Sequence, residues 1–591
     1  MSPPQTPTSG TQEDHHRVRD VEHGFTTDSS TAHPPSSEQE KYHEGGPGST
    51  TPGDETDDAR EKVQPPDFGG WSFRFLIASI VLGSMLIALN ATVLGTAIPS
   101  ITSEFGTVDD VGWYASAYLI ANCAMSPLVG RLYRIFRLKV MFISFVAIFE
   151  IGSLVAATAQ SSTVLIVGRA ISGVGGSGIL NGGQTIIAAT VPIARRSLLN
   201  GMILGCFALG QAIGPLIGGA LTQAISWRWC FYINLPIGGL VIFMFLVVVR
   251  LPVKTLSSGE KSLLERVKEI DLVGFATFSG ACIMFLTGLQ YGGTEYDWKS
   301  ATVIGLIVAG LVTFGILACW FAHKGEASLI PPRLLRNRIN LMITLTSFIQ
   351  SGATITALYW LPIWFQAIKG ASPLRSGVMI LPLILSQLVG SVVCGALVQK
   401  TGYYLPEVVC GNALVAIGAG LMSTFSPDTS RGAIIGFQIL VGLGRGLVLQ
   451  LLVTAMQANV PKEDASIASA YVMFSQFLGG AFFASIARTI FTTSIVPAVA
   501  EYVPGIDPSI VLDTGVTELS SELPPKYLEG ALLAYNKSID HVFYLQLAAA
   551  VCAFVTGWGM GWKNLKKIKQ ERDEDTEQSD VQLTAQRSNI A

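Results

Sequence analysis

The chain has 591 residues, of which 49% are hydrophobic and only 14% are charged, and its formal net charge is -3. This composition is that of a membrane protein with many spans and excludes an ordinary soluble enzyme. The eight cysteines lie singly in or beside apolar runs without a Cys-x-x-Cys pair, which argues against a disulfide framework or a metal site.

Residues 1–71 are rich in Ser, Thr, Pro, Gly and charged residues and predict a disordered cytoplasmic tail, because they cannot bury a core. From residue 72 onward, apolar segments of about twenty residues follow one another, each long enough to cross a hydrocarbon core of ~30 Å as a helix. We predict fourteen membrane helices, at 74–98, 112–132, 139–159, 163–189, 199–225, 230–250, 272–290, 301–322, 341–367, 374–399, 404–424, 432–457, 467–491 and 542–562.

Lysines and arginines gather in alternate loops between these spans, and the positive-inside rule then places both tails in the cytoplasm. The last outer loop, at 492–540, contains the sequon Asn-Lys-Ser. We therefore predict glycosylation at Asn536.

The stretch at 205–239 contains two consecutive patterns. Gly210, Gly214 and Gly218 recur at every fourth position, so in a helix they form one bare stripe against which a second helix can pack closely. Pro215 lies in the same run and bends a membrane helix. Small residues at this spacing are common in any membrane bundle, but that explanation does not cover the Trp-Arg-Trp run that follows.

These two patterns, GQAIGPLIGGAL (210–221, including Gly219) and SWRWCFYINLPIG (226–238), resemble the fifth-helix motif of major facilitator superfamily antiporters. Within that superfamily they are similar to the fourteen-helix drug:proton exporters. The resemblance implies an all-α polytopic membrane protein with the major facilitator fold. It predicts an N-terminal six-helix bundle at 72–250, linkers and two inserted helices at 251–340, a C-terminal six-helix bundle at 341–565 and a tail at 566–591.

The sequence GRLYRIFRLK (130–139) resembles the loop that latches the two bundles together on the cytoplasmic side. The resemblance assigns Gly130, Arg131, Arg134 and Lys139 to this gate. Arg134 replaces the acidic residue usual in the family and Arg137 replaces a glycine, so the latch must use other partners. Alternatively, the basic residues only mark the inner face.

Residues 167–178, VGRAISGVGGSG, are similar to the fourth-helix motif, whose arginine, here Arg169, is implicated in proton transfer. A structural arginine satisfied by carbonyls is the alternative. Glu150 is the clearest acidic residue deep in a span, and it is either a proton carrier beside Arg169 or a static structural partner. The end of the first predicted helix, ALNATVLGTAIPSI (88–101), resembles that of the drug:proton exporters, in which an aspartate is common where this chain has Asn90. Asn90 and Thr92 either bind substrate or bond to a neighbouring helix.

The ninth predicted helix carries YWLPIWFQAIKG (359–370), in which Tyr359, Trp360 and Gln366 put aromatic faces and one amide on a helix that lines the cavity in this fold. Such a surface suits flat, apolar or cationic organic molecules, although some of these aromatics can instead pack on lipid. Gln211 and Arg445 are further candidates for the cavity. Neutral amides also occur at membrane depth at Gln350, Gln450, Gln457 and Gln476.

We therefore predict a secondary transporter, not an enzyme, which exports small amphipathic organic molecules in exchange for protons by alternating access. Its expected partners are the lipid bilayer, the substrate and protons, with no nucleic acid, cofactor or metal. Its resemblance to fungal drug and toxin efflux pumps implies the plasma membrane or the vacuole. An uptake carrier of the same fold, for example of siderophores, and a non-transporting sensor are the alternatives.

Overall fold

The computed structural model describes residues 70–105, 110–191, 193–247, 269–293, 295–504 and 525–568, and a few isolated residues besides. The chain divides into two units, Met1–Lys62 and Val63–Ala591, and all described residues belong to the second. Apart from their edges, the two predicted tails lie outside the described residues.

The regular elements of the described residues are all helices; isolated β-bridges occur there, but no β-strand forms. The first helices are α1 Trp71–Thr92, α2 Leu94–Phe105, α3 Val111–Ile135, α4 Leu138–Ala157, α5 Ser162–Thr190, α6 Ile193–Ala224, α7 Trp229–Tyr232 and α8 Asn234–Val247. They are followed by α10 Leu272–Tyr291, α11 Ala301–Lys324 and α12 Pro332–Arg336. The last are α13 Arg338–Lys369, α14 Pro373–Met379, α15 Leu381–Thr401, α16 Leu405–Met422, α17 Arg431–Ala458, α18 Ala465–Tyr502 and α21 Pro525–Gly557. Short 3-10 turns occupy Gly325–Ala327, Lys462–Asp464 and Trp558–Met560.

Within the described residues, 13 helical segments are long and apolar enough to cross a membrane. The remaining predicted span, at 112–132, is the continuous helix α3, which is too polar to be counted with them. Its Tyr114, Ser116, Tyr118 and Asn122 are all buried, and α3 packs against α5, α10 and α18. Because protein surrounds α3, its composition does not have to match that of a lipid-facing helix.

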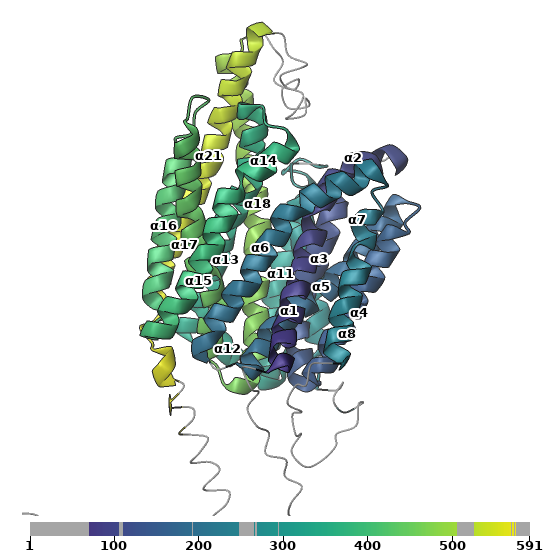
Figure 1. Ribbon diagram of the computed structural model, residues 1–591, viewed down its shortest axis with the longest axis vertical. Coiled ribbons are helices and arrows are strands. Elements are labelled where there is room, and N and C mark those ends of the chain that lie inside the picture. Colours follow the sequence, from purple (N-terminus) through teal and green to yellow (C-terminus); the bar gives the residue numbers. More distant parts are fainter. Residues whose placement is uncertain are drawn as a thin grey trace, which may run out of the picture. The chain divides into compact units, whose positions relative to one another are not determined.

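The contacts sort the helices into two groups, with α1–α8 (the N-bundle) at the right of Figure 1 and α13–α21 (the C-bundle) at the left. In the N-bundle α5 packs on α3 and α4, and α1 packs on α6 and α8. In the C-bundle α17 packs on α15 and α16, and α13 packs on α18 and α21. The helices α10 and α11 form a pair that contacts α3 and α18, so the inserted pair lies beside the seam between the bundles.

The predicted outer loop at 492–540 is helical at both ends. Helix α18 continues to Tyr502 and α21 begins at Pro525, so only the middle of that stretch lies outside the described residues. The two extended ends pack together, since a Cβ placed on Gly530 would meet the carbonyl of Tyr502. This contact between α18 and α21 stabilises the helical turns after residue 492 and before residue 540, which hydropathy alone assigns to a loop.

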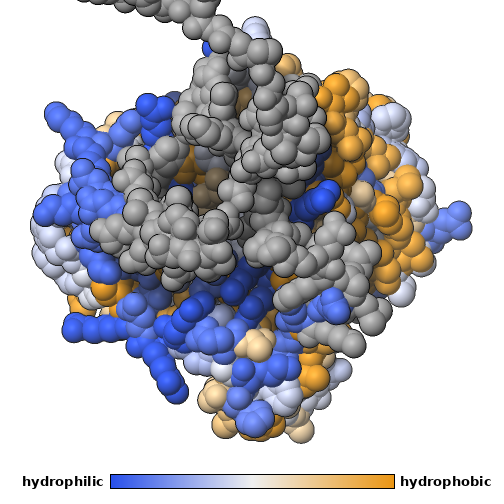
Figure 2. Space-filling view, turned by 90° about the horizontal axis from the view of Figure 1, so that it is seen from below, coloured by the Kyte–Doolittle hydropathy of each residue, from blue (hydrophilic) through white to orange (hydrophobic). Residues whose placement is uncertain are grey.

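Basic residues gather on one end of the body, at the turn from α3 to α4 (Arg134 and Arg137), at the end of α11 (Lys324) and in α12 (Arg333 and Arg336). Figure 2, seen from below, shows hydrophilic side chains over this end and apolar side chains on the flank at the right. The end is the one that the positive-inside rule assigns to the cytoplasm. We call it the basic end.

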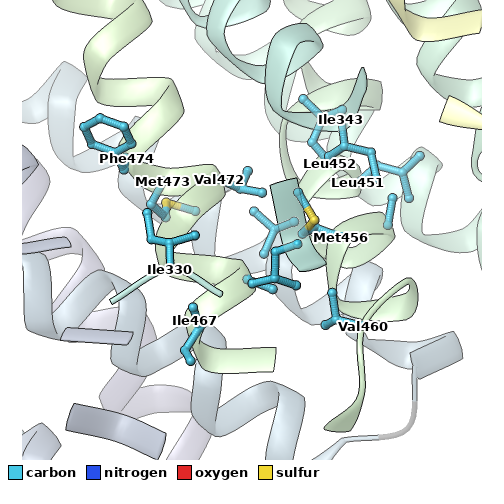
Figure 3. Close-up of a cluster of buried hydrophobic side chains, with 14 of the residues drawn as sticks. Ile330, Ile343, Leu451, Leu452, Met456, Val460, Ile467, Val472, Met473 and Phe474 are labelled. Atoms are coloured by element: carbon cyan, nitrogen blue, oxygen red, sulfur yellow. The ribbon is translucent and has the colours of Figure 1, made fainter. Parts of the chain in front are cut away.

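Buried apolar side chains form one cluster that joins both bundles and three others that each stay within one bundle. The joining cluster combines Cys123 and Leu128 of α3 with residues of α10, α13, α17 and α18. Figure 3 shows part of it, with Ile343 of α13 near Leu452 of α17, and Ile330 near Met473 of α18. The two bundles therefore share an apolar core at the seam beside α10.

Candidate functional site

The glycine stripe of α6 is filled by α1 and the start of α2. A Cβ on Gly210 would lie 2.9 Å from Ala88 Cβ, one on Gly218 would lie 2.6 Å from the carbonyl oxygen of Val93, and one on Gly214 would overlap Thr92. Only glycine allows this approach, because contacts this short leave no room for a side chain. Gly219 differs, since nothing lies within 4 Å of a Cβ placed there.

The Trp-Arg-Trp run that follows the stripe holds the outer end of α2. Arg228 donates two hydrogen bonds to Glu104, at 2.7 and 3.0 Å, and Trp227 Nε1 donates a third at 2.8 Å. Arg228 also reaches the carbonyl of Ala159 at 3.0 Å. The hydrogen bonds from Arg228, and then the one from Trp227, hold the pKa of the Glu104 carboxyl below its usual range. Glu104 was not predicted, because it lies outside every span and motif.

Asn234, in the same run, joins three helices of the N-bundle. Its Nδ2 lies 3.4 Å from Asn90 Oδ1 on α1 and 3.2 Å from Ser153 Oγ on α4. All three side chains are fully buried. Asn90 is therefore turned to neighbouring helices, whereas Thr92 donates within its own helix α1, to the carbonyl of Ala88 at 3.1 Å beside the stripe. Of the two alternatives, the contacts of Asn90 favour helix-to-helix bonding over substrate binding.

Arg169 is satisfied by backbone carbonyls. Its Nε donates to the carbonyl of Tyr114 at 2.8 Å and its Nη1 to that of Asn90 at 3.2 Å, while the guanidinium lies 4.9 Å from the ring centre of Tyr118. No hydrogen bond or ion pair joins it to Glu150 in the part of the chain that the structure describes. The expected pair of Glu150 with Arg169 is thus absent from this conformation.

The Glu150 carboxyl instead lies against α8. Both of its oxygens are enclosed and have no hydrogen-bond partner within the described residues. A Cβ placed on Gly238 would overlap the carboxyl group, so this glycine makes the space that Glu150 occupies. An enclosed carboxylate without a partner is costly, and this position is suited to a carboxyl group that carries its proton.

The three cavity candidates on α13, Tyr359, Trp360 and Gln366, have different surroundings. Trp360 is only 5% exposed and its ring centre lies 4.8 Å from that of Phe491, so in this conformation it packs within the C-bundle core. Tyr359 is 64% exposed. Gln366 donates to Ser376 Oγ of α14 at 3.1 Å. The rotation of α13 about its axis separates residues that are neighbours in the sequence.

Asn536, the predicted glycan acceptor, is buried and hydrogen-bonded within the C-bundle. It is 7% exposed within α21, where its Oδ1 accepts from Trp364 Nε1 at 2.8 Å and its Nδ2 donates to the carbonyl of Phe425 at 2.8 Å. A glycan attached to Nδ2 would break the second bond and find no space. The glycosylation at Asn536 stays a prediction, and this packing disfavours it.

The predicted gate motif on α3 lies directly against α18. A Cβ on Gly130 would be 2.7 Å from Ala470 Cβ and 3.0 Å from the carbonyl oxygen of Ser466. Arg134 Nη1 is 2.8 Å from Asp464 Oδ1, which also places the charge of Arg134 against the C-bundle. Because arginine stands where the family usually has an acid, its partner has to be acidic, and Asp464 supplies that charge.

Asp464 also pairs with Arg333 of α12, and its side chain is fully buried between the two arginines. Arg131 donates to the carbonyls of Leu329 at 3.2 Å and Glu326 at 3.0 Å, and also to that of Ser328. The segment after α11 is therefore part of the gate.

Lys139, the fourth residue assigned to the gate, contacts the N-bundle. Its Nζ donates to the carbonyl of Leu246 at 3.2 Å, within the N-bundle.

Deeper in the protein, two hydrogen bonds to glutamine side chains of α17 cross the seam. Gln184 Nε2 of α5 lies 3.3 Å from Gln450 Oε1 of α17, and Arg196 Nη1 of α6 lies 3.4 Å from Gln457 Oε1. Both contacts lie near the ends of α5 and α17 on the basic side. The two other polar candidates for the cavity are the half-buried Gln211 and the buried Arg445, and neither has a hydrogen bond within the described residues.

The family model described as Major Facilitator Superfamily matches residues 80–484. The chain belongs to the major facilitator superfamily. As a member of this superfamily it is a multi-pass membrane transporter and not an enzyme.

Curated relatives of this transporter extend over nearly its whole length. It is 43% identical to the MFS-type transporter pigP of Monascus ruber, over 90% of this chain and 95% of the relative. It is 39% identical to the MFS-type efflux pump MFS1 of Trichophyton rubrum, over 85% and 94%. The efflux pump mlcE of Penicillium citrinum is also 39% identical, over 84% and 91%.

Solved structures show the same fold for this transporter. The proton:xylose symporter XylE matches with a TM-score of 0.56 at 15% identity, over 84% of this chain and 98% of the symporter. The human organic anion transporter MFSD10 matches with a TM-score of 0.53 at 14% identity, over 82% and 100%. The predicted major facilitator fold is thereby confirmed.

Proposed function

We propose that this transporter exports small amphipathic organic molecules in exchange for protons, by alternating access between its two bundles. Relatives named efflux pumps, similar over most of their length, support the direction of transport. The filled stripe at Gly210, Gly214 and Gly218 supports exchange, because this stripe carries the resemblance to antiporters. The plasma membrane or the vacuole is the membrane that we propose.

The observation that carries the proposal is the closure of the seam at the basic end. The contacts of Arg134 with Asp464, of Arg196 with Gln457 and of Gln184 with Gln450 all join the bundles there. If this end faces the cytoplasm, the conformation is closed to the cytoplasm. Export then requires a second conformation in which these contacts are broken.

Proton coupling in this proposal uses Glu150. In the present conformation Gly238 encloses its carboxyl group, which favours the protonated form, and separation of α4 from α8 would admit water and release the proton. Arg169 serves as a fixed structural cation, since carbonyls already satisfy it. Each exchanged proton supplies about 1.36 kcal/mol per pH unit and about 2.3 kcal/mol per 100 mV.

A flux assay in reconstituted liposomes tests the proposal. The lumen is made acidic, and amphipathic fluorophores of anionic, neutral and cationic type are added outside. Exchange predicts that at least one fluorophore accumulates inside and that a protonophore abolishes the accumulation. In liposomes preloaded with the same fluorophores, movement of the fluorophore outward together with protons would support an uptake carrier, and the absence of gradient-dependent flux in both arrangements would leave only the sensor.

The role of Glu150 has its own test. We expect Glu150→Gln to keep substrate binding but to flatten the dependence of flux on pH. Glu407→Gln is the matched control, because Glu407 is a buried acid of the C-bundle that the proposal does not use. Unchanged pH dependence in Glu150→Gln would make Glu150 a structural residue.

A further inference from the structure

Arg445 is a buried cation without a counter-ion. It lies in α17, only 9% of the residue is exposed, and its Nε is enclosed without a partner. No hydrogen bond or ion pair of its guanidinium occurs within the described residues. Arg169, the buried arginine of α5 in the N-bundle, is by contrast satisfied by two carbonyls. A buried guanidinium with neither a carbonyl nor a carboxylate is costly, so Arg445 needs another explanation.

The contacts of α17 fix the face from which Arg445 projects. Leu443 packs on Gly390 of α15, and Leu447 packs on Gly411 of α16. Arg445 is two residues from each leucine, which is about 200° around the helix. Its side chain therefore leaves α17 on the side opposite to α15 and α16. Apart from those two neighbours, α17 contacts α6, α13 and α18.

Two neutral amides lie at the same depth as Arg445. Counted from the basic ends of their helices, Arg445 in α17, Gln350 in α13 and Gln387 in α15 lie about 12 to 14 residues in, or roughly 20 Å. Gln350 is 1% exposed, and within the described part of the chain neither atom of its amide has a hydrogen-bond partner, nor does Gln387 Oε1. This depth is near the middle of a hydrocarbon core of ~30 Å.

The buried acids of the C-bundle do not neutralise Arg445. Asp540 accepts a hydrogen bond from Asn536 Nδ2 at 3.2 Å, within α21, which is not among the main contacts of α17. Glu407 lies in the first turn of α16, on the other side of α17 from Arg445. Asp464 pairs with two arginines at the basic end. The described part of the chain thus holds a cation in the middle of the C-bundle and no anion to pair with it.

We propose that Arg445 binds an acidic group of the substrate, and that the transporter carries amphipathic organic anions such as carboxylates. A guanidinium pairs with a carboxylate through two parallel hydrogen bonds, and the low dielectric of a buried site strengthens that pair. The free amides of Gln350 and Gln387 hold neutral polar groups of the same molecule. This inference rests on the proposed function, and it replaces the cationic substrates that the aromatic residues of α13 suggested.

A matched pair of probes tests the inference. Pyrene-1-butyrate and pyrene-1-butyramide share one apolar body and differ in a single group, a carboxylate or a neutral amide. Binding of each to the purified full chain in phosphatidylcholine nanodiscs is measured by fluorescence anisotropy, with empty nanodiscs as background. We expect the wild-type protein to bind the carboxylate about tenfold or more tightly than the amide. Equal affinities would overturn the proposal.

Variants of Arg445 test whether this residue causes the preference for the carboxylate probe. Arg445→Gln should bind both probes with similar affinity, whereas Arg431→Gln, at the exposed start of the same helix, should keep the wild-type preference. A preference that survives in Arg445→Gln would overturn the proposal. If thermal melting shows that this variant does not fold, Arg445→Lys replaces it, since a lysine cannot pair through two bonds and should lower the preference about threefold or more. An unchanged preference in that variant would also overturn it.

The binding assay uses no gradient, so its outcome is independent of the flux assay. A preference for the carboxylate without gradient-driven flux would overturn export and leave the role of Arg445 intact. Gradient-driven flux without a preference for the carboxylate would support export and overturn the role of Arg445.

Discussion

Asp464 is the residue on which the closed seam depends, and replacing it with asparagine tests the gate. The side chain of Asp464 is fully buried, while those of its partners Arg134 and Arg333 are 27% and 46% exposed. Asp464→Asn keeps the size of the side chain and removes its charge. Both arginines can then turn to water, so the substitution weakens the contact between the bundles without leaving a buried cation.

The size of the effect follows from these exposures. The contact of Arg134 with Asp464 is an ion pair of 2.8 Å between a partly exposed guanidinium and a fully buried carboxylate, so its worth lies between that of a surface pair and that of a buried one, about 1–3 kcal/mol. Arg333 adds at most about 1 kcal/mol, because it is exposed and also pairs with Glu326 at 3.0 Å. A neutral amide costs less to bury than a carboxylate, so we expect a net loss of about 2 kcal/mol. This loss shifts the equilibrium about thirtyfold toward the conformation open at the basic end.

Distances across the seam measure this shift. Spin labels at Arg137→Cys and Lys462→Cys lie on opposite bundles, and both native residues are exposed. The exposed native cysteines Cys319, Cys410 and Cys552 are first replaced by serine. Double electron–electron resonance should then show a longer distance between the labels in Asp464→Asn than in the parent.

Glu463→Gln is the matched control, because Glu463 is the exposed carboxylate beside Asp464. It should give the distance distribution of the parent. The same distribution in Asp464→Asn would refute the assignment of the gate to this contact.

Further predictions concern the stripe, the outer ion pair and the sequon. Gly214→Leu should abolish transport while the protein still inserts, because a side chain there overlaps α1, whereas Gly219→Leu should keep flux in the liposome assay. Glu104→Gln should lower the free energy of unfolding by at most about 1 kcal/mol at pH 7, since the ion pair with Arg228 is partly exposed. Because the folded pKa of Glu104 lies below the unfolded value, this loss should vanish as the pH falls below about 4, as urea titrations at several pH values would show. Removal of N-linked glycans should leave the electrophoretic mobility unchanged, because Asn536 is buried and bonded.

Each of these has an outcome that contradicts it. Normal flux in Gly214→Leu would show that the close contact with α1 is not needed. A loss in Glu104→Gln that persists at pH 3 would assign the effect to packing. A mobility shift that disappears in Asn536→Gln would show that this residue does carry a glycan.

The positions of the membrane helices follow from the sequence alone. In lipid each backbone polar group must be satisfied within its own segment, so an apolar run of sufficient length becomes a helix whatever surrounds it. The stripe at Gly210, Gly214 and Gly218 is equally local, because three glycines at this spacing share one face of any helix. Its contact with α1 agrees with that prediction.

The partners of individual side chains were not predictable in this way. Arg134 meets Asp464, which lies 330 positions later in the chain, and Trp360 is buried while its neighbour Tyr359 is exposed. Such pairs depend on how far each helix is rotated and how closely it packs, and no local pattern encodes these quantities. Asn536 shows the same limit, since a sequon describes three residues and not the helix that buries them.

The sequence by itself thus determined the helices, the closely packed glycine face and the superfamily. Only the tertiary structure decided that Glu150 lies against Gly238 rather than Arg169, and that Arg445 meets no hydrogen-bond partner or counter-ion among the described residues. Helix formation in a membrane is a local consequence of hydrogen bonding. The pairing of buried polar groups is a property of several helices packed together, and therefore exists only once the chain has folded.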